Sequence, residues 1–457
     1  MSQVTVASTL LYGQNREGYA PVLDVPHCNI AVIAAEPEAT VKLCGISCLE
    51  RLLRNLQRLG SKCVTIISAT PQTIELHLAA RSWPRSELAL KVRPQNGSEF
   101  SARDASEISV DDSGAANAPT LIIDAGIYQD ARLLKALMAR QETAVLLDSD
   151  PPPTLLPLLE THRRHEEWWM CGAAIVAKPG LLGQREDVPL FAALFEAAAA
   201  GEVAVIDVNQ QPTYLVDLRR DLRPLWFPAP QQPSQRGVAE SLLLDAAQNG
   251  TLDLPAKVHA PIETWIIARL CKTRITPNQI TFCTAIISIL VAVLFACGKL
   301  PAATLLALAV GVLDGLDGKQ ARVKVETTKL GKGEHSLDYI LELSWWAALA
   351  YHFTSTGQLP HAYWWLALLF GSDLIDRLAK VVVKKRTGRN LDDLAPFERF
   401  VRLIGGRRNI YIWILGCGLA LGAADNGFVS LCWWGAVTAA VHTLRASWIL
   451  VGPAHAR

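Results

Sequence analysis

Several features of other protein classes are missing from this sequence of 457 residues. The net charge is only +1, so the chain has no general attraction for nucleic acid, and we expect no nucleic-acid partner. The ten cysteines include no CxxC pair, so the sequence indicates neither a zinc site nor a disulfide framework. The first residues, MSQVTVASTLLYGQNREGY, have no basic start and no long apolar core, so we expect no signal peptide.

Long apolar runs are abundant, but they are confined to one part of the chain. Hydrophobic residues make up 50% of the sequence, and residues 278–450 hold nearly all the long runs, whereas residues 1–260 resemble an ordinary soluble domain. Six runs approach the roughly 20 residues that span a bilayer. They lie at about 279–298, 300–317, 336–354, 361–383, 409–424 and 427–450. We therefore predict a soluble α/β domain followed by an all-α, six-helix transmembrane domain.

The loops between these runs differ in positive charge. Lysines and arginines gather before the first run, between the second and third, and between the fourth and fifth. The alternate loops, near Lys299, 354–360 and 424–426, carry almost none. The positive-inside rule therefore places both termini and all the basic loops in the cytoplasm. We expect a multi-pass protein of a bacterial-type inner (cell) membrane.

The soluble part alternates between strand and helix patterns. Short apolar runs predict strands at 28–35, 63–68, 120–124, 144–147, 173–177 and 203–207. Helical spacing predicts helices at 46–59, 191–200 and 238–247. A strand–helix–strand order is typical of a parallel sheet. The polar segment 95–118 is expected to be a flexible excursion.

Proline-rich sequence marks the boundary between the two parts. We predict domains at 1–222 and 261–457, joined by a linker with a short helix at 223–260. The segment Pro261–Lys272 (PIETWIIARLCK) is amphipathic and predicts an interfacial helix lying on the membrane. A surface helix on the soluble domain is the alternative.

Acidic residues interrupt the second and third apolar runs. Asp314 and Asp317 are spaced i, i+3, and Glu334, Asp338 and Glu342 are spaced i, i+4, i+8, so each set shares one helix face. If these faces meet, the converging carboxylates need cations to stay ionised. Oxygen ligands of this kind favour Mg²⁺, Mn²⁺ or Ca²⁺. The alternative is that the acids pair with lysines and arginines of the loop.

The residues after the first acid resemble a known family. Residues 314–322 (DGLDGKQAR), followed by Gly331, resemble the signature of the CDP-alcohol phosphotransferases, also called CDP-alcohol phosphatidyltransferases. The entry sequence Thr276–Thr281 (TPNQIT) is typical of the family just before its first span. The resemblance covers roughly Pro255–Leu450. It implies six transmembrane helices and a site open to the cytoplasm, in agreement with the topology inferred from the loops.

The resemblance also implies roles for particular residues. It implies two Mg²⁺ or Mn²⁺ ions, held by Asp314, Asp317, Glu334 and Asp338. It implies that the CMP part of the donor contacts Gly318, Ala321 and Arg322, together with Asp314. Asp338 would be the catalytic base that removes a proton from the acceptor hydroxyl, whose oxygen attacks phosphorus as CMP leaves. We also expect Lys319 and Arg322 to meet phosphate charge.

The second half of the motif departs from the family pattern. His335 stands where an aspartate is expected, so two registers are open. In the preferred register, Glu334 is the third acid, Asp338 is the fourth and Glu342 is an extra acid. In the other register, Asp338 is the third acid and the alternative acid Glu342 is the fourth. His335 is either a ligand or a hydrogen-bonding neighbour of the ligands.

Two further groups bear on the acceptor. Asp373 and Asp376 either line the site or pair with Arg377 and Lys380. Arg407 and Arg408 are candidate acceptor-binding residues, because related enzymes that use inositol phosphate place arginines in this region. The alternative is that these two arginines only set the topology.

The soluble domain resembles a sugar nucleotidyltransferase that has degenerated. Segments 41–45 and 49–53 are similar to the part that follows the glycine-rich loop of that family, and Asp124 is similar to its metal-binding aspartate. The loop itself is missing, and Glu36 and Glu38 would repel a triphosphate. We predict that this domain is inactive. It would bind a nucleotide or a partner, or stabilise a dimer. A fusion of this kind also resembles archaeal enzymes that make CDP-inositol and then di-inositol phosphate.

These observations predict an integral membrane CDP-alcohol phosphotransferase. It would move a substituted phosphate from CDP-diacylglycerol or a CDP-polyol to an acceptor alcohol, with phospholipid-type synthesis favoured over inositol-phosphate chemistry. We expect it to work in the lipid bilayer as a homodimer. One alternative is a catalytically impaired membrane protein that binds CDP-lipids or acts as a scaffold. Another is a transporter with an acidic ion site.

Overall fold

The structure is a computed structural model that describes residues 28–80, 88–104, 118–177, 185, 188–326 and 334–451, apart from residues 96, 98, 161, 163 and 166. The described residues form two compact units, and each is described by itself. The first holds residues up to Asp217 together with Asp221–Ala246, and the second holds Leu218–Arg220 and the residues from Ala247 onward. The segment predicted as a linker is therefore divided, with 223–246 in the first unit and 247–260 in the second.

The first unit is built on one mixed sheet with the strand order β11-β8-β10-β6-β1-β4-β5. The central pairs β1–β4 and β1–β6 are parallel, as are β4–β5 and β8–β11. Strand β10 runs antiparallel to both of its neighbours, β6 and β8, so the sheet is not wholly parallel. The strands are β1 (Asn29–Ile33), β4 (Cys63–Ser68), β5 (Ala89–Pro94), β6 (Thr120–Asp124), β8 (Ala144–Asp148), β10 (Trp168–Val176) and β11 (Ala204–Asp207).

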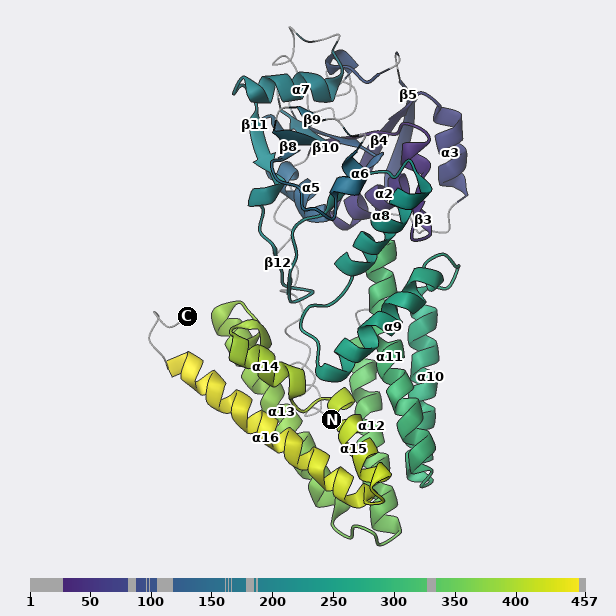
Figure 1. The fold of residues 1–457 in the computed structure, drawn as a ribbon, viewed down its shortest axis with the longest axis vertical. Coiled ribbons are helices and arrows are strands. Elements are labelled where there is room, and N and C mark those ends of the chain that lie inside the picture. Colours follow the sequence, from purple (N-terminus) through teal and green to yellow (C-terminus); the bar gives the residue numbers. More distant parts are fainter. Residues whose placement is uncertain are drawn as a thin grey trace, which may run out of the picture. The chain divides into compact units, whose positions relative to one another are not determined.

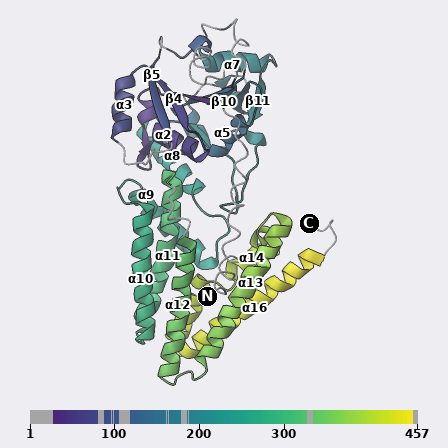
Figure 2. The ribbon, with the colours of Figure 1, turned by 180° about the vertical axis from the view of Figure 1, so that it is seen from behind.

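Helices cover both faces of this sheet. Figure 1 shows α7 on one side and α2 and α5 on the other, and Figure 2 shows the same arrangement from behind. The helices are α2 (Cys48–Arg58), α3 (Pro71–Ala79), α5 (Ala131–Met138), α6 (Leu156–Leu159), α7 (Leu190–Ala199) and α8 (Pro233–Ala246). Ser47 begins α2, because its side chain accepts a hydrogen bond from the backbone N–H of Glu50. The inner strands β1, β6 and β8 are mostly apolar because both of their faces are buried.

Short elements complete the first unit and its junction. They are β2 (Lys42–Leu43), β3 (Ile46–Ser47), β7 (Ile127–Gln129), β9 (Arg164–His165), β12 (Tyr214–Leu215), β13 (Arg220–Asp221), β14 (Trp226–Pro228) and the 3₁₀ turns η1 (Glu38–Thr40) and η3 (Val208–Gln210). Strand β5 was not predicted from the sequence. Part of the polar segment expected at 95–118 lies outside the described residues.

The second unit is helical. Its elements are α9 (Leu254–Leu270), α10 (Pro277–Ala296), α11 (Leu300–Lys324), α12 (Glu334–Ser355), α13 (Ala362–Thr387), η5 (Leu391–Asp393), α14 (Pro396–Ile404), α15 (Arg408–Ala420) and α16 (Ala424–Val451). Each predicted apolar run falls within one helix, except for a few residues at the run ends. Among the described residues, α10, α11 and α16 are long and apolar enough to cross a membrane. The count of six spans stays a prediction.

Apolar side chains lie on the outside of this unit as well as inside it. On α10, Phe282 is 67% exposed, and Ile286, Ile289 and Val293 follow on the same helix. Exposed side chains of this size in water would cost free energy, whereas lipid tails accommodate them. The surface of α10 therefore fits a membrane environment.

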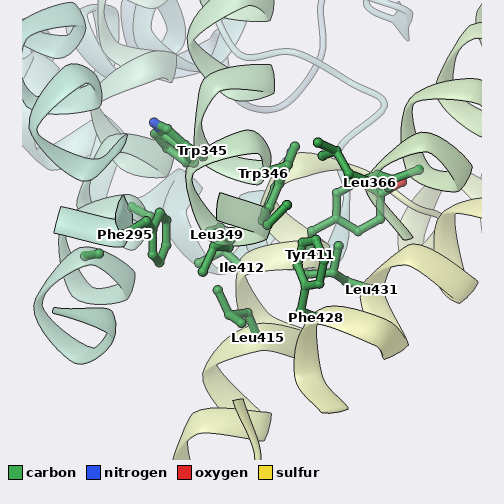
Figure 3. Close-up of a cluster of buried hydrophobic side chains, with 14 of the residues drawn as sticks. Phe295, Trp345, Trp346, Leu349, Leu366, Tyr411, Ile412, Leu415, Phe428 and Leu431 are labelled. Carbon is green, nitrogen blue, oxygen red and sulfur yellow. The ribbon is translucent and has the colours of Figure 1, made fainter. Parts of the chain in front are cut away.

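Aromatic side chains hold the interior of the helical unit together (Figure 3). Trp346 of α12 meets Tyr411 of α15 edge to face, with ring centroids 5.7 Å apart. Phe353 of α12 lies against Phe428 of α16 at 5.6 Å. These contacts fix α12 against α15 and α16, and thereby fix the positions of the polar residues at the other end of α12.

Candidate active site

The acid motif lies on one continuous helix. Helix α11 runs to Lys324, seven residues beyond the predicted end of the second apolar run at 317. It ends at Val325, whose left-handed backbone (φ 52°) stops the helix. All residues from Asp314 to Arg322 are therefore helical, and Asp314 and Asp317 project from neighbouring positions of one face.

The first residues of α10 hold the second acid of the motif, Asp317, in place. Thr276 and Gln279 form a reciprocal capping box that begins α10. One turn later, the Thr281 hydroxyl donates to Oδ2 of Asp317 at 2.7 Å, and the backbone N–H of Gly318 lies 2.6 Å from Oδ1. Asp317 is only 5% exposed, so these hydrogen bonds replace water around the carboxylate.

The loop before α10 is tied to the end of α11. The Gln320 side-chain amide donates to the carbonyl of Ile275 at 2.5 Å, and the Lys324 ammonium donates to the carbonyl of Thr273 at 2.9 Å. Gln320 and Lys324 therefore satisfy backbone groups of the loop. Together with Thr281, they fix the register between α10 and α11.

The first acid faces a cation. The Arg408 guanidinium, from the first turn of α15, donates to Oδ2 of Asp314 at 2.6 Å. Arg408 also interacts electrostatically with Asp338 and Glu342 of α12. Helices α11, α12 and α15 thus bring one guanidinium and three carboxylates to the same region. Asp338 of α12 interacts electrostatically with both Asp314 and Asp317, and direct packing of α12 on α11 stays a prediction.

The metal site is incomplete among the described residues. They contain no group of three or more His, Cys, Asp or Glu side chains arranged to hold a metal ion. Glu334 begins α12, but its side chain and that of His335 lie outside the described residues, as does Gly331. The carboxylates of Asp314, Asp317 and Asp338 suit a hard divalent cation in donor type.

The CMP-binding residues predicted from the motif lie together on α11. The Arg322 guanidinium lies over Gly318, where an added Cβ would be only 3.3 Å from its Nη1. Arg322 Nε also donates to the carbonyl of Ala247 at 2.7 Å. Ala321 is the residue before Arg322 on the same helix. Glycine at 318 therefore leaves room for the guanidinium one turn along.

Lys319 does not meet the expectation that it faces phosphate. It is 1% exposed, and its ammonium group bonds to the side chains of Gln248 and Thr264. The Thr264 contact measures 2.6 Å. The lysine therefore helps to hold α9 against α11.

Helix α9 supplies an acid that sequence analysis missed. Glu263 is 7% exposed, and its carboxyl lies so close to Gly315 that an added Cβ there would be 2.8 Å from Oε1. Burial raises the pKa of the Glu263 carboxyl to about 7, with Lys319 lowering it and Asp314 raising it further. The glycine between the two motif acids was a signal that another side chain packs there.

The predicted interfacial helix is longer than expected and contains Pro261 in its interior. Its outward face carries Trp265, 59% exposed, with the Arg269 guanidinium 3.7 Å from the centre of its ring. Its buried face carries Glu263 and Ile267 against α11. An apolar aromatic face on one side and a packed face on the other fit a helix at a membrane surface.

Of the two candidate acceptor-binding arginines, Arg408 begins α15 and Arg407 is the residue before it. Arg408 pairs with Asp314 as described, and Nη1 of Arg407 is buried with no hydrogen-bond partner among the described residues. A buried guanidinium nitrogen without a partner is costly, so this position suits an anionic ligand.

Asp373 and Asp376 are ion-pair partners. Asp373 accepts hydrogen bonds from Arg377 Nε and from the Tyr339 hydroxyl, each at 2.8 Å. Asp376 pairs with Lys380 at 2.8 Å and with His442. Of the two interpretations offered by the sequence, pairing with Arg377 and Lys380 is the one present.

In the first unit, acids gather at the carboxyl ends of the central strands. Asp124 ends β6, and the backbone N–H of Gly126 donates to its Oδ1 at 2.8 Å. The side chain of Glu38 packs against Gly126, where an added Cβ would be 2.9 Å from Glu38 Cβ. Burial raises the pKa of Asp124 to about 6, and the Glu38 charge raises it further. Glu36 accepts a hydrogen bond from Thr70 at 3.2 Å.

A family model confirms the resemblance of the second part of the chain. Residues 274–441 match the model described as CDP-alcohol phosphatidyltransferase. No curated protein matches the chain.

Solved structures resemble each part in turn. A putative glucose-1-phosphate thymidylyltransferase from Bacillus anthracis is 10% identical, with a TM-score of 0.34, covering 47% of this chain and 95% of that one. The inositol-1-phosphate CTP transferase from T. maritima is 12% identical, with a TM-score of 0.32 and coverage of 47% and 96%. Phosphatidylinositol phosphate synthase of Mycobacterium tuberculosis, with CDP-DAG bound, is 20% identical, with a TM-score of 0.32 and coverage of 42% and 94%. These TM-scores are low, so the fold description depends on the elements of this chain.

Proposed function

We propose that the chain is a membrane-bound CDP-alcohol phosphotransferase, which transfers a substituted phosphate from a CDP-linked donor to an acceptor alcohol and releases CMP. The observation that carries this proposal is the motif on α11, in which Asp314, Asp317, Gly318 and Arg322 lie on one helix within the segment that matches the family. The approach of Asp338 from α12 supports it.

Each group then has a chemical task. Bound Mg²⁺ or Mn²⁺ would neutralise the donor's diphosphate and polarise its scissile bond. Asp314, Asp317, Glu334 and Asp338 are the proposed ligands, and Thr281 orients Asp317 through its hydroxyl. Arg322 binds phosphate oxygen of the CMP part, which Gly318 lets approach the backbone. Asp338 accepts the proton of the acceptor hydroxyl as its oxygen attacks phosphorus.

The donor determines whether the product is a lipid or a water-soluble compound. We propose CDP-diacylglycerol, which gives a lipid product, over a soluble CDP-polyol. Purified protein in vesicles with Mn²⁺ is offered each donor with a panel of polyols and polyol phosphates. Labelled product that partitions into organic solvent supports the lipid donor, and labelled product that stays in water supports the CDP-polyol.

Topology and assembly complete the proposal. Both termini and the basic loops would lie in the cytoplasm of a bacterial-type cell, and the protein would be a homodimer. Labelling of cysteines placed singly near residue 357 and near residue 389 of a cysteine-free variant tests this arrangement. A membrane-impermeant maleimide added to whole cells should react only near residue 357, and reaction near residue 389 would reverse the orientation.

The first unit is proposed to be catalytically silent. Glu36 and Glu38 lie on the loop after β1, and Glu38 lies beside Asp124, so a triphosphate would meet three carboxylates. A folded chain that transfers no nucleotidyl group from CTP to a sugar or inositol phosphate supports this, and release of pyrophosphate would overturn it.

A second candidate is a protein that binds CDP-lipids without turning them over. A glutamate in the third acid position favours it, because the extra methylene shifts the metal geometry. Tight binding of CDP-diacylglycerol without CMP release would support this candidate.

A further inference from the structure

Arg408 is positioned as an internal cation of the proposed active site. Its side chain is 15% exposed and is bonded to Asp314 at 2.6 Å, and its guanidinium lies 5.9 Å from the ring centre of Trp345. Its backbone belongs to the first turn of α15, where Tyr411 packs on Trp346. The backbone is therefore fixed, while the long side chain retains rotatable bonds.

Three carboxylates surround this one cation. Asp314 comes from α11, and Asp338 and Glu342 come from successive turns of α12. Among the charges near Glu342, Arg408 is the strongest favourable one. Among the described residues, Arg377 also interacts with Glu342, and it is already bonded to Asp373 at 2.8 Å.

A divalent cation and Arg408 compete for Asp314. A guanidinium that donates to Oδ2 occupies lone pairs that a metal ion would use, and the two positive charges repel each other at contact distance. A metal ion on Asp314 would therefore weaken the guanidinium's bond to this carboxylate and favour its withdrawal. Glu342, one turn beyond Asp338 on α12, is an anion that can receive it, because it interacts electrostatically with the same arginine.

We propose that Arg408 is a mobile counterion that moves from Asp314 to Glu342 when a divalent cation binds, so that Glu342 holds the arginine and is not a metal ligand. The proposal depends on the metal-dependent function stated above. It also gives the extra acid of α12 a task, which agrees with the register in which Glu334 and Asp338 are the third and fourth acids.

The test measures Mn²⁺ affinity and not turnover. Free Mn²⁺ is followed by electron paramagnetic resonance during titration of the full-length protein in detergent. Arg408→Gln removes the competing charge and is expected to bind Mn²⁺ about tenfold more tightly than the wild type. Arg408→Lys keeps the charge, and its affinity should stay within about threefold of the wild type. Thermal unfolding confirms that each variant is folded.

Glu342→Gln distinguishes two possible roles of this acid, as a partner of Arg408 or as a metal ligand. On its own, it is expected to weaken Mn²⁺ binding several-fold, because Arg408 loses its alternative partner. In the Arg408→Gln background, the same change should have little effect, within about twofold. An equal loss in both backgrounds makes Glu342 a metal ligand and overturns the proposal.

Three other outcomes would also count against the proposal. If Arg408→Gln and Arg408→Lys tighten binding equally, the effect is one of packing, and the proposal is wrong. If the wild type binds no Mn²⁺ at all, the metal-dependent function fails and the inference fails with it. If the wild type binds Mn²⁺ but none of the variants differs from it, only the inference fails.

Discussion

Two carboxylates, one in each unit, end in opposite electrostatic surroundings. Asp124, at the end of β6, has Glu38 beside it, and this like charge adds to the effect of burial on its pKa. Asp314, on α11, has the Arg408 guanidinium at 2.6 Å. A triphosphate and its metal need positive charge and backbone N–H groups, and the loop after β1 offers the acids Glu36 and Glu38 in their place. The comparison shows that the first unit holds its carboxylate beside a like charge, whereas the helical unit holds its carboxylate beside an opposite charge.

The largest effect is expected at Asp338. Asp338→Asn removes the proposed proton acceptor while keeping the size of the side chain, so CMP release should fall about 10²–10⁴-fold. The rate of CMP release at saturating donor is the measurement. Asp425→Asn, at the start of α16, is the control and should leave the rate within about twofold of the wild type. Retained turnover in Asp338→Asn would remove this residue from the chemistry.

The next largest effect tests which acid of α12, Glu334 or Glu342, is a metal ligand. Glu334→Gln should lower CMP release at least about tenfold if Glu334 is the third metal ligand, since a neutral amide is a poorer ligand for a hard cation. Glu342→Gln should lower it less. If the order of the two effects is reversed, the preferred register is wrong.

Thr281 should affect both stability and metal binding. Thr281→Val leaves Oδ2 of the buried Asp317 without the hydroxyl donor, at a cost of about 1–3 kcal/mol. The midpoint of thermal unfolding should fall, and Mn²⁺ affinity should fall with it. Thr281→Ser keeps the hydroxyl and should behave like the wild type. A lower midpoint with unchanged Mn²⁺ affinity would make Thr281 purely structural.

The raised pKa of Glu263 predicts that this residue makes the protein less stable as pH rises. Its folded pKa, raised to about 7, exceeds the unfolded value of about 4.3, so the folded state binds a proton that the unfolded chain has lost. Its contribution to stability is present at low pH and is lost as pH rises from about 4.3 through about 7. Glu263→Gln should therefore lose less thermal stability than the wild type between about pH 5 and pH 8. Parallel pH curves for the two proteins would contradict the assignment.

The smallest effect belongs to the acid pair of the first unit. Glu38→Gln removes the like charge beside Asp124 and should stabilise that unit by roughly 0.5 kcal/mol at pH 8, measured by urea unfolding. The exposed Glu75→Gln is the matched control and should change little. Destabilisation by Glu38→Gln would mean that the acid pair has a favourable role not assigned here.

The sequence was informative where one local pattern determines one local structure. The helical spacing of 46–59 and the apolar runs each predicted elements that are present. Strand β5 was missed because its alternating sequence, ALKVRP, lies at a half-exposed sheet edge and holds few apolar residues. The antiparallel direction of β10 was missed because the apolar pattern of a strand does not depend on whether its neighbours are parallel or antiparallel to it.

At the site, the motif identified α11 but not the residues that approach it from elsewhere. Lys319 was expected at phosphate because it lies beside the acids in sequence, yet it points to α9 and is buried there. Glu263 lies about fifty residues before the motif. Its place beside Gly315 depends on the packing of α9 on α11, which the sequence alone did not indicate. Such contacts depend on helix packing, which the spacing of residues within one helix does not specify.

CMP release by the purified wild-type protein tests the central claim most directly. The folded protein is given CDP-diacylglycerol, Mn²⁺ or Mg²⁺ and a panel of acceptor alcohols, and CMP is measured alongside the lipid product. We expect one CMP for each product formed, with loss of both on addition of a metal chelator. Folded protein that releases no CMP with any acceptor and either metal would contradict it.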